Sequence, residues 1–569
     1  METVEPAPRR PRTALITNHG YAGKEIPVGG APDTGGQNFY VNALAAALEE
    51  IGFDVTVFAR GGFPFFESNQ VREGIETVSA YVRYVYIPGG GDAFIRKEDI
   101  APALDEEVVF LEAYIREQAD AAGCRPWEFF EIINTHYWDA GILAVKLIER
   151  WQNLAAREFL EQAANGVLAP FARRFAGEKV HQLSLSREIF YHLGEAARGA
   201  YGALAPSEIV QRLTGETVKL NAAVDADEEK QEFAESICIG GELAARLQIG
   251  GVDLLTLFKH IDTHVWTPHS LGIVKERNFW GKDPTLVRRL KFRERDAHEQ
   301  VVTNRTPLFC ATSPEIWRAL IAYHGLSPEC IFDFPPCIDG RAFHPRSQGE
   351  LAEVYTFLSE KSGITVSRLQ ESLLVFETSR MDETKRKDLL LGAFAEVAAK
   401  RSDVYLFIGG GPEESRVFQK LRAQIEGSPI LNRRAFLLGF VSEDLVEPLF
   451  SAVDLFVSAS EMEGFGMSVS QAAAAGVAIV SSDLIPFATH YSKNAAVVVP
   501  AGYQHGFALA MTRLLTDGEE RARRAEQLLE AASAFDWTAT ASRFTAWFRE
   551  KRRALPGTRT SVYPHPKKS

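Results

Sequence analysis

The sequence of residues 454–481 is DLFVSASEMEGFGMSVSQAAAAGVAIVS, in which two apolar runs flank a glycine-containing turn and an alanine-rich segment. The runs at 454–458 and 478–481 predict two strands, and the segment between them predicts a turn that opens a helix. Two strands joined by a crossover helix lie parallel in one sheet. This stretch therefore predicts an α/β fold.

The same alternation of strand and helix extends through the C-terminal half. Further strands are predicted at residues 373–377, 403–408, 435–439 and 496–499. Helices are predicted to begin near Arg386, Glu414, Asp444, Gly466 and His505. Strands that alternate with helices in this way are typical of a parallel, Rossmann-like sheet.

The N-terminal half shows the same pattern with one long interruption. Strands are predicted at residues 13–17, 54–59, 77–87, 132–135 and 263–267, and helices at 35–51, 106–121 and 286–300. From residue 151 to about 259 the alternation stops, and the spacing predicts helices at 154–164 and 228–247. We therefore expect a helical insertion in the first domain.

The length of 569 residues exceeds one ordinary core, and the segment 340–349, GRAFHPRSQG, has the composition of a linker. We predict one Rossmann-like domain over residues 1–340, with the insertion at about 151–260, and a second over residues 341–536. Residues 537–569 are predicted to form a last helix, at 538–553, that crosses back to the N-terminal domain, and a tail.

Composition argues against several classes of function. The formal net charge of −13 disfavours general nucleic-acid binding, which needs a basic surface. No apolar run is long enough for a transmembrane helix, and residues 1–12 lack the apolar core of a secretory signal. The five cysteines are scattered without a Cys-x-x-Cys pair. We expect a cytoplasmic protein with small-molecule partners, no nucleic-acid or membrane partner, and scope for a homo-oligomer.

The turn in the opening stretch suits a phosphorylated sugar. Gly464 and Gly466 allow a ligand to approach the backbone, and the following helix presents unpaired amides at its positive end. Glu463 can then accept hydrogen bonds from hydroxyls beside the phosphate. The alternative is an ordinary strand–turn–helix in which Glu463 is a surface cap.

Two cations follow the strand at 373–377, in the segment SRMDETKRKD. Loops at the carboxyl ends of parallel strands line the ligand crevice, so Arg380 and Lys385 are placed to hold a diphosphate. They would do so without a metal ion. The alternative is a solvated run of charges before the next helix.

Glycines also cluster at the start of the first helix, in GGAPDTGGQ at 29–37. This is neither the dinucleotide fingerprint nor a P-loop, but Gly35 and Gly36 can offer backbone amides to a phosphate. A flexible turn is the alternative.

Two further segments follow strands and face the predicted crevice. THYWDAG at 135–141 supplies His136, Tyr137, Trp138 and Asp139 for polyol binding, and PHSLGIVK at 268–275 supplies His269 and Lys275. A lone histidine is more often structural, so neither histidine identifies a site by itself.

Metal ligands are not predicted. The prominent Asp-x-Asp pair, Asp225 and Asp227, lies in a charged loop of the insertion, where solvation explains it. No His/Glu or Cys cluster has the spacing of ligands, and no G-x-S-x-G segment is present. We expect no cofactor beyond a sugar-nucleotide co-substrate.

Taken in order, these segments resemble the retaining glycosyltransferases of family 4. The chain is most similar to the group that contains sucrose-phosphate synthase, sucrose synthase and mannosylfructose-phosphate synthase. The matching segments are GGAPDTGGQ at 29–37, HYWDAG at 136–141, HSLG at 269–272, PPCID at 335–339, SRMDETK at 379–385, IGGGPEE at 408–414 and EGFGM at 463–467. The resemblance covers both halves except the insertion.

The resemblance implies the GT-B fold, in which an acceptor-side domain and a donor-binding domain face each other across a cleft. It implies catalytic roles for Arg380, Lys385, Glu463 and His269. It implies donor-binding roles for Gly35, Gly36, Gly439, Gly464, Phe465, Gly466, Met467 and Gln471. It implies acceptor-binding roles for Gln37, His136, Tyr137, Asp139, Lys275 and Arg293, with Arg295 as an alternative to Arg293.

One position departs from the family pattern. Relatives have a second glutamate eight residues after the first, and it binds both ribose hydroxyls; here that residue is Gln471. A neutral amide accepts weaker hydrogen bonds than a carboxylate, so we expect donor affinity to be about tenfold lower.

The combination predicts a retaining hexosyltransferase. The donor would be a nucleoside diphosphate sugar, uridine diphosphate glucose ahead of guanosine diphosphate mannose, and the acceptor a small sugar, sugar phosphate or polyol. A non-catalytic sugar-nucleotide sensor, suggested by Gln471, and a nucleotide-sugar epimerase of the same fold remain as alternatives. A nicotinamide dehydrogenase is disfavoured because the fingerprint glycines are absent.

Overall fold

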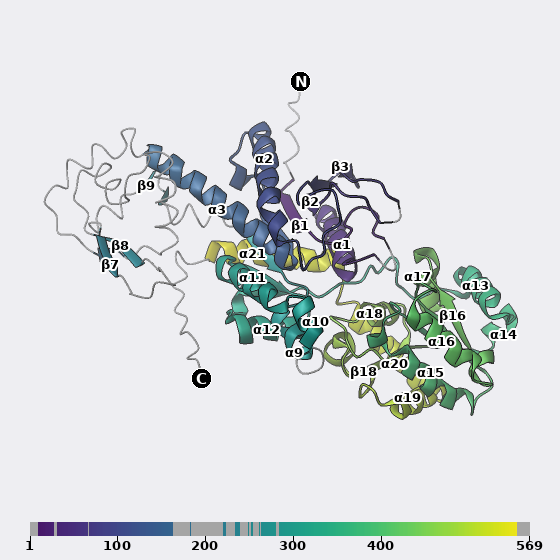
Figure 1. Cartoon of the computed structure of the whole chain (residues 1–569). Coiled ribbons are helices and arrows are strands. Elements are labelled where there is room, and N and C mark those ends of the chain that lie inside the picture. Colours follow the sequence, from purple (N-terminus) through teal and green to yellow (C-terminus); the bar gives the residue numbers. More distant parts are fainter. Residues whose placement is uncertain are drawn as a thin grey trace, which may run out of the picture.

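The computed structural model describes residues 10–27, 31–66, 68–162, 261, 263–279 and 284–554, together with five short strands between residues 182 and 253. The described chain forms two units that lie side by side (Figure 1). Each unit is a sheet with helices packed against it, and the sheets have eight and six strands.

The N-terminal sheet has the strand order β13-β12-β11-β5-β1-β2-β4-β3 and is parallel except for β3. Its strands are β1 (Arg12–Thr17), β2 (Asp54–Arg60), β3 (Gly74–Thr77), β4 (Val82–Ile87), β5 (Ile132–His136), β11 (His264–Thr267), β12 (Leu308–Ala311) and β13 (Ile331–Asp333). Its main helices are α1 (Gly36–Glu50), α2 (Leu104–Ala122), α3 (Tyr137–Gln162), α9 (Gly272–Phe279), α10 (Pro284–Arg289), α11 (Phe292–Arg305) and α12 (Pro314–His324). The central strands are buried on both faces, as continuous apolar runs require.

The C-terminal sheet is parallel throughout, in the order β16-β15-β14-β17-β18-β19. Its strands are β14 (Leu373–Thr378), β15 (Val404–Gly409), β16 (Ala435–Gly439), β17 (Leu455–Ser458), β18 (Ala478–Ser482) and β19 (Val497–Val499). Its helices are α13 (Ala352–Ser362), α14 (Val366–Gln370), α15 (Lys387–Ala398), α16 (Arg416–Glu426), α17 (Glu443–Ser451), α18 (Met467–Ala474), α19 (Gln504–Thr516) and α20 (Gly518–Ala532). The order reverses at β14 and β17, so the crevice at their carboxyl ends is a switch point where ligands bind in open α/β sheets.

The last helix, α21 (Trp537–Ala554), packs against α1 of the N-terminal unit (Figure 1). Trp537 meets the ring of Tyr40 edge-on at 4.9 Å between centroids, and Phe544 lies 5.3 Å from Phe334. Arg549 forms a bidentate ion pair with Glu131, with the Nη2–Oε2 contact at 3.0 Å. The chain therefore crosses between the two units twice. The two crossing segments meet where the backbone amide of Ile338 donates to the carbonyl of Phe535 at 2.7 Å.

Three sequence predictions are wrong in part. The strand predicted at 77–87 is an antiparallel hairpin of β3 and β4, because the chain turns back through Ser79 and Ala80. The helix predicted at 286–300 is divided into α10 and α11, because Lys291 adopts a left-handed conformation at φ 47°. Within the helix predicted at 228–247, residues 234–238 form β8 (Ala234–Cys238), because antiparallel pairing with β7 (Leu220–Ala223) outweighs local helix propensity.

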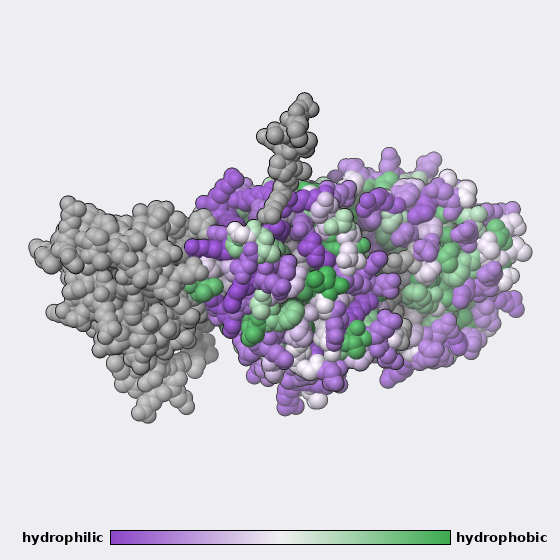
Figure 2. Space-filling model, turned by 90° about the horizontal axis from the view of Figure 1, so that it is seen from above, coloured by the Kyte–Doolittle hydropathy of each residue, from purple (hydrophilic) through white to green (hydrophobic). Residues whose placement is uncertain are grey.

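The helix predicted at 154–164 is the end of α3 as far as Gln162, and three further short strands are β6 (Gln182–Leu183), β9 (Gln248–Ile249) and β10 (Val252–Asp253). Asp225 and Asp227 lie outside the described residues. No helix in the described part of the chain is both long and apolar enough to cross a membrane. The face seen in Figure 2 is mainly hydrophilic where it is described, with apolar residues in separate small patches.

Candidate active site

The donor-side loops place Lys385 against Glu463. Lys385 Nζ lies 2.6 Å from Glu463 Oε1 and 3.2 Å from the carbonyl of Met462, and the two charged side chains are 8% and 18% exposed. Lys385 follows β14 and Glu463 follows β17, which are neighbours in the sheet. The parallel sheet thus brings together two residues that the sequence separates by 78 positions.

Arg380 lies in the same crevice edge but is exposed, and the structure shows no hydrogen bond or ion pair from its side chain to any described residue. The nearby Arg386 is differently placed, because it pairs with Glu461 and Asp388. Arg380 is therefore the guanidinium that remains available to an anion at this edge, beside the neutralised pair of Lys385 and Glu463.

Helix α18 begins at the glycine turn. Its N-cap, Gly466, has φ 99°, and a Cβ there would lie 2.4 Å from the Ile485 side chain, so glycine is required on two counts. A Cβ at Gly464 would meet nothing within 4 Å, which leaves that backbone open to a ligand. Phe465 is buried against Phe487 and Tyr491, so only its backbone faces the crevice.

The glycine-rich segment of the N-terminal unit meets this turn directly. A Cβ at Gly36, the first residue of α1, would lie 3.5 Å from Sδ of Met467, the first residue of α18. Gly35 is the N-cap of α1 and is equally unobstructed. The N-termini of two helices from different units therefore converge, and both present unpaired amides and positive dipole ends.

Two other donor-side predictions lie on separate elements. Gly439 ends β16 with φ 71°, and its carbonyl accepts the amide of Gly410 at 2.8 Å, which joins it to the glycine loop after β15. Gln471 lies partly buried on α18, one turn beyond Met467.

A chain of histidines lines the N-terminal side of the crevice. His136 Nδ1 lies 2.9 Å from His269 Nε2, and Gln37 donates to the carbonyl of His136 at 3.3 Å. Burial lowers the pKa of His136 to about 3, and burial together with the neighbouring imidazole lowers the pKa of His269 well below its usual value. Both rings are therefore neutral near pH 7.

Asp139 is fully buried and pairs with His19, which follows β1, at 3.0 Å between Oδ2 and Nδ1. Tyr137 is also buried, with the guanidinium of Arg295 above its ring at 4.1 Å. Trp138 is wrongly predicted to face the crevice. It is buried and stacks on His298, since it lies on the opposite face of the first turn of α3.

Cations gather on the acceptor side of the N-terminal unit. Arg295 is buried and bonds to Glu299 at 2.6 Å, to Tyr137 and to Ser270, and Lys97 pairs with Asp33. Burial, followed by the positive charges of Arg295 and Lys97, lowers the pKa of Lys275 to about 7. The surroundings of Lys275 disfavour its protonated form, and a bound anion would stabilise that form.

Arg293 does not join this group. Its side chain is 72% exposed and pairs with Glu276 at 2.9 Å, because a shift of two positions along α11 turns it away from Arg295. The alternative residue named from the sequence, Arg295, is the one that the structure places beside Lys275.

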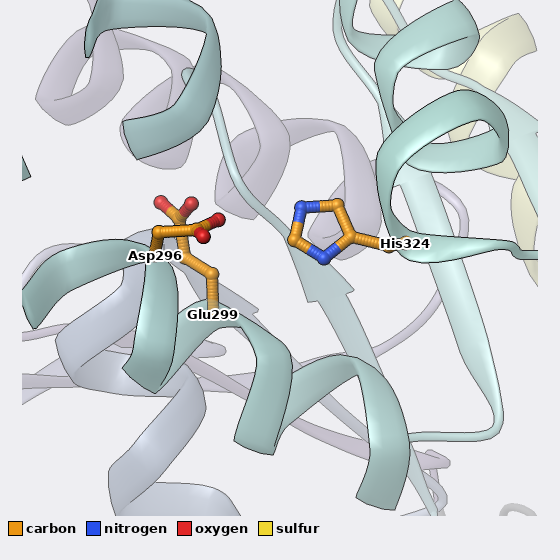
Figure 3. Close-up of side chains that lie close together, drawn as sticks. All are labelled: Asp296, Glu299 and His324. Atoms are coloured by element: carbon orange, nitrogen blue, oxygen red, sulfur yellow. The ribbon is translucent and has the colours of Figure 1, made fainter. Parts of the chain in front are cut away.

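Asp296, Glu299 and His324 lie close together (Figure 3). Each offers one possible ligand atom, and these atoms lie within 4.8 Å of one another. The sequence prediction that no His/Glu cluster has such a spacing is therefore wrong. Both oxygens of Glu299 already accept hydrogen bonds, from Arg295 at 2.6 Å and from the amide of Gly272 at 2.8 Å. The guanidinium supplies the counter-charge, so we assign Glu299 to the ion network and give the cluster no metal role.

Sequence reasoning missed His19, Asp33 and Lys97. Only His19 carried a usable signal, since it follows the strand predicted at 13–17 and so lies at the carboxyl edge of the sheet. Asp33 and Lys97 come from long loops without periodicity, and only their ion pair in three dimensions reveals them.

Comparison with known proteins identifies the C-terminal unit. Residues 365–529 match the family model described as Glycosyl transferases group 1. The chain carries a group 1 glycosyltransferase domain.

Two relatives extend the similarity beyond this domain. The mannosylfructose-phosphate synthase of Agrobacterium fabrum is 25% identical over 489 residues, which cover 84% of this chain and 78% of that relative. D-inositol 3-phosphate glycosyltransferase 2 of Catenulispora acidiphila is 26% identical over 289 residues, 48% of this chain and 62% of that relative.

Solved structures establish the fold. The sucrose-phosphate synthase of Thermosynechococcus elongatus superposes with a TM-score of 0.59 at 17% identity, covering 96% of this chain and 100% of that one. HepE of Anabaena, in complex with UDP and glucose, gives a TM-score of 0.50 at 12% identity over 96% and 100% of the two chains. These likenesses show that the chain has the GT-B fold, and the fold class predicted from its sequence is confirmed.

The donor-side geometry predicts that Lys385→Ala weakens diphosphate binding. The substitution removes a charge-assisted contact and leaves the Glu463 carboxylate unneutralised at the crevice, so affinity for a nucleoside diphosphate should fall about 10- to 100-fold. Calorimetric titration of UDP and GDP measures this change. Arg386→Ala is the matched control, because Arg386 is engaged by Glu461 and Asp388. Equal affinity in Lys385→Ala and the unmodified protein would contradict the prediction.

Proposed function

We propose that the glycosyltransferase moves a hexosyl group from a nucleoside diphosphate sugar to a small phosphorylated sugar, with retention of configuration. The observation that carries the proposal is the contact between the first residues of α1 and α18, where two helix N-termini converge beside Arg380 and Lys385. Such a place favours a diphosphate more than a single phosphate or a neutral ligand.

On the donor side, each group has a separate task. Arg380 and Lys385 would neutralise the leaving diphosphate, and the amide of Gly36 would bind one of its oxygens from the opposite unit. The amide of Gly35 already donates to Asn38 Oδ1 at 3.1 Å, so Gly35 would contribute its unobstructed backbone. When an anion takes over Lys385, Glu463 is released to accept hydrogen bonds from the sugar hydroxyls. Charge that develops on the departing oxygen is then stabilised by groups that are already in place, and no metal ion is required.

On the acceptor side, burial and the nearby positive charges of Arg295 and Lys97 disfavour the protonated form of Lys275. The Tyr137 hydroxyl and Ser270 bond to Arg295 and fix its guanidinium. A phosphate group on the acceptor would stabilise protonated Lys275, whereas a neutral polyol would not. The name of the Agrobacterium relative, a phosphate synthase, agrees with this preference.

The acceptor hydroxyl would attack the anomeric carbon on the face from which the diphosphate leaves. The hydroxyl proton would then pass to an oxygen of the departing phosphate, because burial lowers the pKa of His269 well below its usual value and makes that imidazole a weak base. The glycosidic bond forms as the bond to the phosphate breaks, and closure of the two units would exclude water from this step.

Uridine diphosphate glucose is the donor that we propose first, with guanosine diphosphate mannose second. HepE, a structural neighbour whose fold this chain shares, binds UDP and glucose. A sugar-nucleotide sensor is the second candidate function, favoured by Gln471 in the position of the ribose-binding glutamate.

A screen of donors against acceptors tests the function. Release of nucleoside diphosphate should depend on one phosphorylated acceptor and be at least tenfold slower with its dephosphorylated form. Nucleotide binding without release for any pair would favour the sensor, and release without any acceptor would point to hydrolysis.

The acceptor cations predict a pH dependence. Lys275, with a pKa of about 7, is protonated below that pH and neutral above it, and a phosphate binds the protonated form more tightly. The KM for the sugar phosphate should therefore rise as pH increases from 7 to 9, by up to about tenfold per unit. Lys275→Met should raise KM at pH 6.5 and abolish this slope.

Steady-state kinetics at fixed saturating donor measure both effects. Lys146→Ala is the control, because Lys146 is an exposed lysine that pairs with Asp105 in the same unit. A KM that is independent of pH in the unmodified protein would exclude Lys275 from the phosphate site.

Gln471 predicts a gain in donor affinity. Gln471→Glu restores a charged acceptor for the ribose hydroxyls, which is worth about 1.4 kcal/mol more than the amide, or about tenfold in Kd. Titration with the preferred nucleotide sugar measures the change. An unchanged Kd in a folded Gln471→Glu protein would show that the ribose does not contact this position.

A further inference from the structure

Lys387 is a lysine that neither the catalytic scheme nor the family resemblance uses, yet it is the most completely buried cation of the donor-binding unit. It is the first residue of α15, and its side chain has no exposed surface. Its ammonium lies 2.8 Å from the carbonyl of Ser379, 2.7 Å from the carbonyl of Gly409 and 3.0 Å from Glu377 Oε2. The ammonium therefore donates hydrogen bonds to two backbone carbonyls and forms an ion pair with Glu377.

The two carbonyls belong to the two loops that form the donor crevice. Ser379 immediately precedes Arg380, at the carboxyl end of β14. Gly409 ends β15, and the next amide, that of Gly410, donates to the carbonyl of Gly439 at the end of β16. One ammonium thus joins the diphosphate-side loop to the loops at the far end of the sheet.

The packing around this ammonium leaves little freedom. Gly410 has φ 117°, and a Cβ there would lie 2.2 Å from the Ser379 carbonyl oxygen and 3.2 Å from Lys387 Nζ. Glu377 completes the cluster, since Ser379 Oγ donates to its other oxygen at 2.5 Å. The two loops therefore touch through backbone atoms, and the lysine is the group that holds their carbonyls together.

The orientation of one peptide follows from these contacts. The carbonyl of Ser379 points at the buried ammonium, and a trans peptide directs its N–H to the opposite side. The amide of Arg380 is therefore directed away from the interior, on the same loop as the exposed guanidinium. A phosphate at this edge would meet both the side chain and the amide of Arg380.

A purely stabilising role is a poor explanation for this arrangement. Burying a lysine and a glutamate costs desolvation, and apolar residues of similar size usually support a fold as well or better. Burial lowers the pKa of Lys387, with Glu377 opposing the shift. What an apolar side chain could not do is bind two carbonyl oxygens and fix two loops relative to each other.

We propose that Lys387 is a positioning residue for the nucleotide-sugar donor. It fixes the relative position of two loops, the loop that contains Arg380 and the glycine loop after β15. One donor molecule would contact both loops, because it spans from the diphosphate to the base. The assignment rests on the proposed function, because it concerns the binding of the same donor.

The test compares three variants of the full chain. Lys387→Met removes the ammonium and keeps the volume, but it leaves Glu377 buried without its cation. The double variant Lys387→Met/Glu377→Gln removes both charges, and it is the one in which a folding defect is least expected. Glu377→Gln alone is the matched control, since it deletes the ion pair and keeps Lys387 with its two carbonyl contacts.

The readouts are the Kd for uridine diphosphate glucose or whichever nucleotide sugar the unmodified protein binds, the KM for each substrate and the melting temperature. We expect the double variant to show a donor Kd and donor KM at least tenfold higher, with the acceptor KM within about twofold and the melting temperature within a few degrees. Glu377→Gln should keep the donor Kd within about twofold. A merely structural lysine would change the melting temperature and leave the ratio of donor KM to acceptor KM untouched.

A folded double variant with unchanged donor affinity would overturn the role of Lys387 while leaving the proposed function intact. A loss of affinity in Glu377→Gln equal to that in the double variant would also overturn it, because the ion pair would then be the cause. If the unmodified protein binds no nucleotide sugar, the proposed function fails first, and the assignment of Lys387 fails with it.

Discussion

Parallel strand order is the constraint on which the site depends. In each sheet the parallel strands end at the same edge, so loops from distant parts of the chain meet there whatever their separation in sequence. This is how Lys385, after β14, reaches Glu463, after β17, and how His19 reaches Asp139 across β1 and β5. Most residues assigned to the crevice come from such a loop or from the first turn of the helix that follows it; Gln471 and Arg295 lie further along helices.

Charges at that edge are largely paired before any ligand arrives. Lys385 is neutralised by Glu463, Lys97 by Asp33 and Arg295 by Glu299, whereas Arg380 is exposed. Burial, followed by the charges of Arg295 and Lys97, lowers the pKa of Lys275 to about 7. Pairing limits the desolvation cost of buried cations, and it means that an anionic ligand exchanges one partner for another. The same exchange releases Glu463, so diphosphate binding and sugar recognition are coupled through one carboxylate.

The sequence predicted the strands and the local turns well, because both depend on short-range patterns. The C-terminal strands begin and end within one residue of the predictions. Gly466 has a positive φ at the turn that opens α18, as the glycines of the turn sequence implied. Side-chain direction was less predictable. Arg293 and Trp138 each lie on the wrong face of a helix, and the phase of a helix is set by packing partners that the sequence does not identify.

Residues that act across long sequence distances were also beyond prediction. Lys97 and Asp33 meet only in three dimensions, through an ion pair and a backbone amide hydrogen bond between two aperiodic loops. The buried Lys387 looks like one more charge in a solvated run, ETKRKD. The break at Lys291 shows the opposite limit, since a left-handed residue inside a charged segment interrupts a pattern that is helical on both sides.

The contact between α1 and α18 joins these observations into one physical argument. Two helix N-termini from different units approach closely only if the residues at the contact are small or flexible, and Gly36 and Met467 meet both conditions. Without a ligand this approach places two positive dipole ends together, which is unfavourable. Helix α21 packs on α1 with Phe544 and Trp537 buried, so the chain returns to the N-terminal unit and keeps the two helix ends near each other. A diphosphate between them would turn that repulsion into attraction on both sides, so the contact of the two helix ends is a feature that a bound donor would stabilise.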